Sequence, residues 1–211
     1  MDAAGWMRRA IEIAYRGKGS VHPNPLVGCV LVRDGEIIAE GWHGHLGGLH
    51  AEQAAIADAE EKGISTSGST AYVTLEPCNH HGRTPPCTEA LLWAGVEKVV
   101  IGALDPNPTV RGGGMKALKE QGIVVESGLL EEECILQMRP FMHWCVERRP
   151  LVFLKAAVDI DGRVDVDYTS PSERFTSDSS LRWAHKVRSE HMAILVGIET
   201  VIRDNPELTA R

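Results

Sequence analysis

The sequence lacks the features that mark membrane, secreted and nucleic-acid-binding proteins. It contains no apolar run of about 18 residues, so no membrane-spanning helix is expected. Its first residues lack the basic and then apolar layout of a signal peptide. Aromatic residues make up only 5%, and 22 Lys and Arg stand against 29 Asp and Glu. Because a nucleic-acid surface needs a basic face, we expect a cytoplasmic protein with no nucleic-acid and no membrane partner.

Cysteine is also too scarce and too irregularly spaced for a secreted disulfide framework. The five cysteines are Cys29, Cys78, Cys87, Cys134 and Cys145. In a reducing compartment, the closely spaced pair Cys78 and Cys87 points to metal binding or catalysis. The other three fall in apolar segments and are expected to be ordinary buried thiols.

The 211 residues carry 43% hydrophobic and 24% charged side chains, which is typical of globular proteins. Apolar periodicity predicts helices over 3–16, 50–61, 86–93, 115–121, 129–148 and 181–190, and strands over 26–32, 36–42, 70–75, 96–104, 123–126, 151–158 and 192–196. Asp34-Gly35 between the first two strands predicts a tight hairpin. The alternation of strands and helices favours an α/β sandwich with a partly parallel sheet.

The character of the chain changes near residue 149, which predicts two domains, 1–148 and 149–211. The second has only about 60 residues, a length that buries too little apolar surface to be secure by itself. It either packs on the first domain or is the opening of a longer domain.

Three short motifs together indicate a catalytic zinc site: His50-Ala51-Glu52, Pro77-Cys78 and Pro86-Cys87. His50, Cys78 and Cys87 supply three ligands, which leaves a fourth zinc position open for water. Zinc brings the pKa of such a water to about 7. Glu52 lies two residues beyond the histidine, near enough to exchange protons with that water. The order His-x-Glu and then Pro-Cys is typical of zinc deaminases, although eight residues separate the two cysteines here.

Two other interpretations of this pattern remain open. His80 or His81 could close a purely structural zinc site, in which case Glu52 would be a solvated helix residue and the chain a non-catalytic binding module. The cysteines could also be core residues without a metal. Within the enzyme class, a deaminase of another nucleobase stays an alternative, and the negative charge argues against a nucleic-acid-editing one.

The motifs resemble those of a known family. The segments His22-Pro23-Asn24-Pro25, His50-Ala51-Glu52 and 77–87 are similar to the deaminase half of the bifunctional riboflavin biosynthesis (RibD) family, and the likeness covers roughly residues 3–148. Leu154-Lys155-Ala156-Ala157, Asp161-Gly162-Arg163 and 193–211 resemble the start of that family's reductase half. The resemblance implies a cytidine-deaminase-like three-layer α/β/α sandwich with a mixed sheet, followed by an incomplete dihydrofolate-reductase-like α/β segment.

The resemblance also implies an activity and cofactors. The expected reaction is the zinc-dependent hydrolytic deamination of 2,5-diamino-6-ribosylamino-4(3H)-pyrimidinone 5′-phosphate, which gives 5-amino-6-ribosylaminouracil 5′-phosphate and ammonia. Family members also carry an NADPH-dependent reductase, of which only the first portion is expected in this chain. The partner is therefore a small pyrimidine ribotide, and the family tends to form homo-oligomers.

Residue roles carried over from the family fall into four groups. Glu52 is the expected catalytic residue, with His50, Cys78 and Cys87 as zinc ligands. The expected deaminase substrate contacts are Asn24, His43, His80, Arg83, Asp105 and Asn107. The expected reductase substrate contacts are Lys155, Ser172, Arg188, Leu208 and Arg211, and the expected NADPH contacts are Thr176, Thr200 and Asp204.

Several of these residues have a simpler structural explanation. Asn24, Asp105 and Asn107 could be turn formers, and Arg83 could be an exposed surface residue. Arg111-Gly112-Gly113-Gly114 could cradle a phosphate with backbone N–H groups, although a flexible connector is the favoured interpretation.

Overall fold

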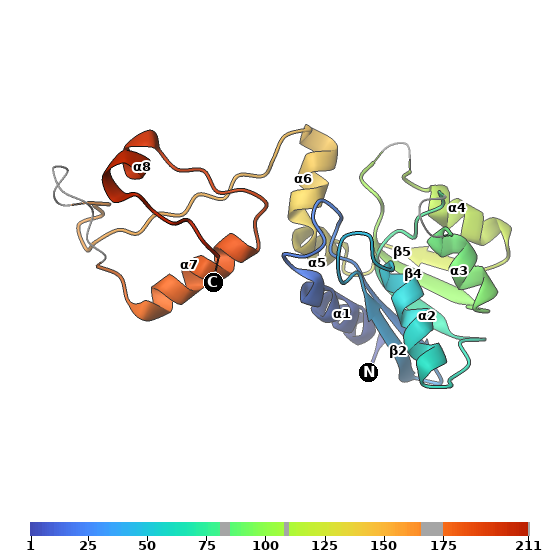
Figure 1. The fold of residues 1–211 in the computed structure, drawn as a ribbon. Coiled ribbons are helices and arrows are strands. Elements are labelled where there is room, and N and C mark those ends of the chain that lie inside the picture. Colours follow the sequence, from blue (N-terminus) through green and yellow to red (C-terminus); the bar gives the residue numbers. More distant parts are fainter. Residues whose placement is uncertain (81–84, 108–109, 166–174, 211) are drawn as a thin grey trace. The chain divides into compact units, whose positions relative to one another are not determined.

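The computed structural model describes residues 1–80, 85–107, 110–165 and 175–210. The chain divides into two compact units, Met1–Leu151 and Val152–Arg211. The first unit carries every element that surrounds the predicted zinc motifs (Figure 1).

A five-stranded mixed sheet forms the centre of the first unit, with the strand order β2-β1-β3-β4-β5. The strands are β1 (Gly28–Arg33), β2 (Glu36–Trp42), β3 (Thr70–Leu75), β4 (Lys98–Ala103) and β5 (Val124–Ser127). β1 runs antiparallel to β2 and β3, whereas β3, β4 and β5 are parallel. Asp34 and Gly35 join β1 to β2 with φ values of 53° and 79°, so the predicted hairpin is confirmed with both turn residues in the left-handed region.

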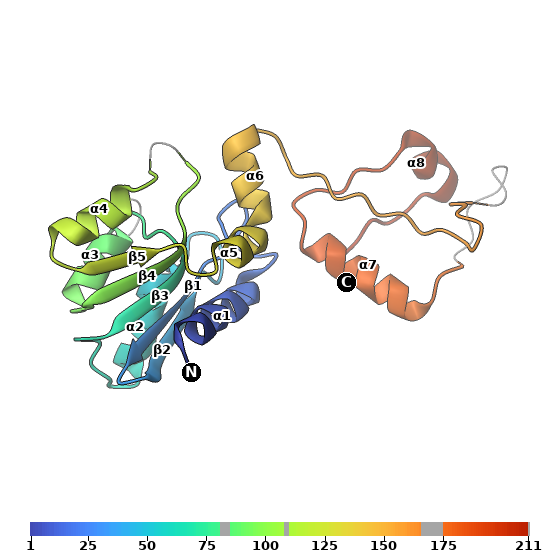
Figure 2. The same ribbon diagram turned by 180° about the vertical axis from the view of Figure 1, so that it is seen from behind.

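Helices cover both faces of this sheet (Figures 1 and 2). One face carries α2 (Ala51–Glu61), α3 (Cys87–Trp93) and α4 (Gly113–Glu120), and the other carries α1 (Ala3–Ala14) and α5 (Glu131–Gln137). A short 3-10 turn, η1 (Tyr15–Gly17), follows α1, and α6 (Arg139–Glu147) follows α5. Side chains along each strand alternate between the two cores: Leu31 packs with the α2 side and Val30 with the α1 side. The predicted three-layer sandwich is therefore confirmed.

Gly41 in β2 allows α2 to lie unusually close to the sheet. A Cβ atom at this position would be 2.1 Å from the backbone nitrogen of Ala55 and 2.4 Å from the carbonyl oxygen of Ala51. Any larger residue would push away the helix whose first turn contains Glu52.

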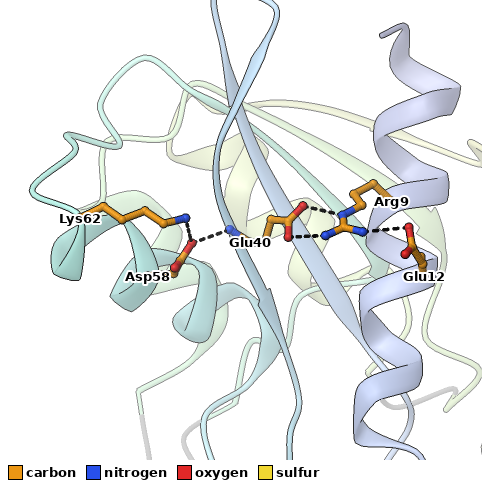
Figure 3. A network of polar contacts seen from close by, with 5 residues as sticks. All are labelled: Arg9, Glu12, Glu40, Asp58 and Lys62. Atoms are coloured by element: carbon orange, nitrogen blue, oxygen red, sulfur yellow. Dashed lines mark hydrogen bonds and ion pairs between the residues drawn. The ribbon is translucent and has the colours of Figure 1, made fainter.

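A polar network ties α1 and α2 to β2 (Figure 3). Arg9 donates to both carboxylate oxygens of Glu40, at 2.6 and 2.9 Å, and pairs with Glu12 at 2.9 Å. The backbone N–H of Glu40 donates to Asp58 at 2.9 Å, and Lys62 donates to the same carboxylate oxygen at 2.6 Å. The network thus joins three elements through one bidentate arginine and one shared aspartate.

The helix predicted over 129–148 is wrong in one respect, because it is two helices. α5 ends at Gln137 and α6 begins at Arg139, with Pro140 in the first turn of α6. In a continuous helix Pro140 would have no N–H for the carbonyl of Leu136, and its ring would clash with that carbonyl.

The second unit contains two helices, α7 (Asp178–Ser189) and α8 (Ile198–Asp204). The strands predicted over 151–158 and 192–196 are not formed: residues 152–165 and 175–210, the described part of this unit, contain no strand. Their apolar side chains stay exposed, with Leu154 at 90% and Leu195 at 97%. Since a strand needs a hydrogen-bonded neighbour, an apolar run alone is not enough to make one.

Candidate functional site

His50, Cys78 and Cys87 come together at one end of the sheet in the first unit. The Nδ1 atom of His50 lies 3.6 Å from the Cys78 sulfur and 3.3 Å from the Cys87 sulfur, and the three potential ligand atoms all lie within 4.8 Å of one another. Among the residues that the structure describes, no fourth histidine, cysteine or carboxylate belongs to this group. One imidazole and two thiols with an open side form a donor set that suits a catalytic zinc ion.

Local hydrogen bonds hold the segments that carry these three side chains. His50 is the N-cap of α2, and its N–H donates to the side chain of Gln53 at 3.3 Å. Gln53 in turn donates to the carbonyl of Pro85 at 3.0 Å, which ties α2 to the segment before Cys87. The N–H of Thr88 donates to the carbonyl of Cys78 at 3.2 Å. Both ligand-bearing loops are therefore attached to the first turns of α2 and α3.

The start of α3 favours a thiolate at Cys78. The N–H of Cys87 points at the Cys78 sulfur, 3.4 Å away, at the positive end of this helix. Hydrogen bonds from the Cys87 thiol and from His50 lower the pKa of Cys78 to about 4. The hydrogen bond to Cys78 and burial raise the pKa of Cys87, and a separate hydrogen bond between His50 and Cys78 raises the pKa of His50. These contacts therefore favour the thiolate form of Cys78, the form in which cysteine binds a metal.

Glu52 is a buried carboxyl group beside this cluster, with only 3% of its surface exposed. It forms a hydrogen bond with the Cys87 thiol. Burial, helped by the nearby Cys78 sulfur, raises its pKa from 4.5 to about 7. A carboxyl group with such a pKa can both accept and donate a proton near neutral pH.

A cavity of about 230 Å³ opens beside the cluster. Seven of the residues predicted from the sequence line it: Asn24, His43, His50, Glu52, Cys78, His80 and Asp105. Apolar lining comes from Pro25, Val27, Leu75 and Phe141. The structure thus brings residues from positions 24 to 141 to one pocket. Arg83 and His81 lie outside the described residues.

Asn24 and His43 form an oriented pair on the pocket wall. The Nδ1 atom of His43 lies 2.9 Å from the carbonyl oxygen of Leu49, which can only accept, so this nitrogen carries the proton. Burial lowers the pKa of His43, so the ring is neutral and its Nε2 atom accepts. The Asn24 amide nitrogen lies 3.1 Å from that atom. The side-chain N–H of Asn24 therefore points at His43, and the amide oxygen of Asn24 can accept a hydrogen bond from another group.

Asp105 and Asn107 form a turn directly after β4. The carboxylate of Asp105 accepts the N–H of Asn107 at 2.8 Å, so these two residues form a turn, as the simpler structural explanation predicted. Asp105 also lines the pocket, and burial raises its pKa. His80 is exposed at the pocket rim, outside the cluster of potential metal ligands.

The residues carried over from the reductase half lie in the second unit on largely exposed segments. Lys155 and Thr200 are exposed, and Thr176 and Asp204 are partly buried. Arg188 in α7 donates to the carbonyl of Thr209 at 3.2 Å, next to Leu208. Ser172 and Arg211 lie outside the described residues.

Sequence reasoning missed Glu76 and Phe141. Glu76 is buried directly before Pro77-Cys78, and a charged residue at the end of a strand as apolar as 70–75 was a signal that could have identified it. Phe141 reaches the pocket from α6, and no local pattern marks it.

Comparisons with known proteins identify the class first. Residues 2–103 match the cytidine and deoxycytidylate deaminase zinc-binding region, and residues 150–211 match the RibD C-terminal domain. The chain is therefore an α/β protein with a zinc-binding region of the deaminase class. No helix in the described part of the chain is long and apolar enough to cross a membrane.

The individual proteins that are most informative for comparison are RibD proteins. The chain is 47% identical to the riboflavin biosynthesis protein RibD of Actinobacillus pleuropneumoniae, over 100% of this chain and 55% of that protein, and 44% identical to RibD of Escherichia coli, over 98% and 55%. A solved structure of the diaminohydroxyphosphoribosylaminopyrimidine deaminase/5-amino-6-(5-phosphoribosylamino)uracil reductase of Thermotoga maritima is 45% identical, with a TM-score of 0.92 over 99% of this chain and 59% of that one. The chain is thus similar to RibD proteins along nearly all of its own length, and it spans about half the length of the curated relatives that it matches.

Proposed function

We propose that this chain catalyses the zinc-dependent deamination of 2,5-diamino-6-ribosylamino-4(3H)-pyrimidinone 5′-phosphate. The observation that carries the proposal is the buried Glu52 beside a three-ligand group that keeps an open side toward a pocket. The names of the two riboflavin biosynthesis relatives, with 47% and 44% identity, support the riboflavin pathway, and the name of the Thermotoga maritima relative supports an aminopyrimidine ribotide as substrate.

In this proposal His50, Cys78 and Cys87 hold the metal. A bound zinc ion would supply Lewis-acid activation of a water molecule. Glu52 takes a proton from the attacking water and delivers it to the ring nitrogen next to the reacting carbon. It then moves the remaining proton of that water from the added hydroxyl group to the exocyclic amine, so that the carbon–nitrogen bond breaks, ammonia leaves and the oxygen stays on the ring as a carbonyl. The balance is one water consumed and one ammonia released.

The remaining pocket residues bind the substrate in the same proposal. The amide oxygen of Asn24 accepts an N–H from the pyrimidine ring, and His43 holds that amide in place. His80, Arg83, Asp105 and Asn107 contact the sugar phosphate and the ring. Arg83 suits the phosphate because its planar guanidinium donates two parallel hydrogen bonds.

The test is ammonia release from the diaminopyrimidine ribotide by the 211-residue chain, with the zinc content measured on the same sample. We expect one zinc per chain and turnover that falls by a factor of about 10² to 10⁴ in Glu52→Gln. Glu61→Gln is the matched control, since Glu61 lies on the same helix and is exposed. Turnover that survives Glu52→Gln would instead favour a non-catalytic role for this residue, and release from cytidine but not the ribotide would point to another nucleobase.

The second unit belongs to the proposal only as part of an NADPH-dependent reductase. Lys155, Ser172, Arg188, Leu208 and Arg211 are its proposed substrate contacts, and Thr176, Thr200 and Asp204 its proposed NADPH contacts. The boundary between the deaminase part and the reductase part of the chain is proposed at residues 148–149, three residues from the division between the compact units.

We further propose that the chain forms a homo-oligomer and is located in the cytoplasm. Trp93 at the end of α3 is 71% exposed, which is typical of a contact surface. All five cysteines are free thiols, as is usual in a reducing compartment. Light scattering on the purified chain measures the oligomeric state.

A further inference from the structure

Glu76 is a buried carboxylate whose side chain accepts hydrogen bonds from the loop after β4 and from the start of α4. The residue is 4% exposed and continues the sheet, because its N–H donates to the carbonyl of Ala103 at 2.9 Å. Its Oε2 atom accepts the N–H of Asp105 at 3.2 Å and that of Gly112 at 2.9 Å, and its Oε1 atom accepts the N–H of Met115 at 3.1 Å. Three backbone donors from one loop and helix start thus converge on one side chain.

This carboxylate caps α4 from a distant strand. Gly112 is the N-cap of α4 and has no side chain that could accept the first free N–H groups of the helix. Glu76 takes that place, with its negative charge at the positive end of the helix. Of the N–H groups that the sequence suggested as a phosphate cradle at 111–114, that of Gly112 therefore binds an internal carboxylate, whereas those of Arg111 and Gly113 donate to the backbone carbonyls of Asn107 and Val110.

A second contact holds the same segment against the metal-ligand loop. A Cβ atom at Gly114 would lie 1.9 Å from the carbonyl oxygen of Pro77, so the start of α4 touches the backbone next to Cys78. This contact is independent of the hydrogen bonds of Glu76. Together they attach Asp105 and the start of α4 to Glu76-Pro77.

From this geometry we infer that Glu76 is a positioning residue, which holds the Asp105–Asn107 turn at the pocket in register with the Cys78 loop. The inference rests on the proposed function, in which Asp105 and Asn107 contact the substrate. Glu76 itself lines the pocket, but three of the roughly four lone-pair sites on its carboxylate already accept backbone N–H groups. Glu76 therefore affects substrate binding through the position of the Asp105–Asn107 turn and not by a direct contact with the substrate.

The test compares Glu76→Gln with Asp58→Asn in the full 211-residue chain. The Gln amide keeps one acceptor oxygen but turns an NH₂ group toward at least one backbone N–H, so that two donors face each other. Asp58 is the matched control, because it also accepts a backbone N–H, that of Glu40 at 2.9 Å, and does not line the pocket.

We expect the amide proton resonances of Asp105, Gly112 and Met115 to move upfield in Glu76→Gln and their hydrogen exchange to accelerate. The KM for the ribotide rises about 10-fold, because the contact residues are misplaced while the reacting groups are not. The kcat stays within about threefold and the zinc content stays at one per chain. Asp58→Asn shows an unchanged KM and unchanged resonances at the three amides.

Unchanged amide resonances in Glu76→Gln would overturn the inference, whatever the kinetics show. Shifted resonances together with an unchanged KM and a lowered kcat or zinc content would overturn it too, because Glu76 would then act through Cys78. If the unmodified chain releases no ammonia from the ribotide, the proposed function fails, and the anchoring of the turn is judged on the amide resonances and exchange rates alone.

Discussion

Replacing Glu52 by Gln is expected to stabilise the zinc-free chain at alkaline pH while it lowers the deamination turnover by a factor of about 10² to 10⁴. The pKa of Glu52 rises from 4.5 to about 7 because the carboxyl group is buried. The folded chain therefore binds this proton more tightly than the unfolded chain does. Its stability falls as the pH rises from 4.5 toward 7, and the penalty is complete above 7.

The size of the effect follows from the difference between the pKa of Glu52 in the folded chain and its pKa in the unfolded chain. One pKa unit corresponds to about 1.4 kcal/mol, so the ionised carboxylate lowers the free energy of unfolding by about 3 kcal/mol at pH 8 and by less than about 1 kcal/mol at pH 5. Gln has nearly the same shape and cannot ionise. Glu52→Gln should accordingly recover most of this energy at pH 8 and little of it at pH 5.

The assay is urea unfolding of the chelator-treated chain at both pH values, followed by circular dichroism. Glu61→Gln, an exposed position on the same helix, serves as the control and should change stability by less than about 0.5 kcal/mol. A Glu52→Gln variant that is equally stabilised at pH 5 and pH 8, or destabilised at pH 8, would refute the reasoning, because the burial of a charge could not then be the cause.

Three further predictions concern the surroundings of the site. Glu40→Ala removes the bidentate partner of Arg9 and should lower the free energy of unfolding by about 1–2 kcal/mol while kcat/KM stays unchanged. Urea denaturation and steady-state kinetics on the same variant measure the two quantities, and an unchanged free energy of unfolding would contradict the prediction. Gly41→Ala places a methyl group 2.1 Å from the Ala55 nitrogen and should reduce zinc content and turnover, whereas Gly197→Ala, with open space around it, should change neither. Removal of the metal by a chelator should stop ammonia release, and one equivalent of zinc should restore it; release that persists in the metal-free chain would rule out the metal's role.

The motifs predicted much of the candidate site because its chemistry is written in local patterns. His50-Ala51-Glu52 opens a helix, so the ligand and the carboxyl group lie within one turn of each other. Pro86-Cys87 likewise opens α3, which directs the Cys87 N–H at the Cys78 sulfur. The structure brings these segments together into one three-ligand group, as the order of the three motifs predicted. The role of each residue stays a prediction.

Errors in the predicted fold arose where a pattern has two possible outcomes. The apolar periodicity of 129–148 continues through Pro140, and the helix breaks there because proline lacks an N–H. The runs 151–158 and 192–196 are apolar enough for strands, yet nothing in a run states whether a neighbouring strand is present to accept its hydrogen bonds.

The sequence by itself determined the hairpin at Asp34-Gly35, the apolar runs that form the buried strands β1, β3 and β4, and the order of the zinc motifs. These features depend on neighbours only a few residues away, where backbone geometry sets the outcome. Only the tertiary structure decided the role of Glu76, since its three donors lie 29, 36 and 39 residues further along the chain. The same holds for the raised pKa of Glu52, because the burial of a carboxyl group depends on what the fold packs around it.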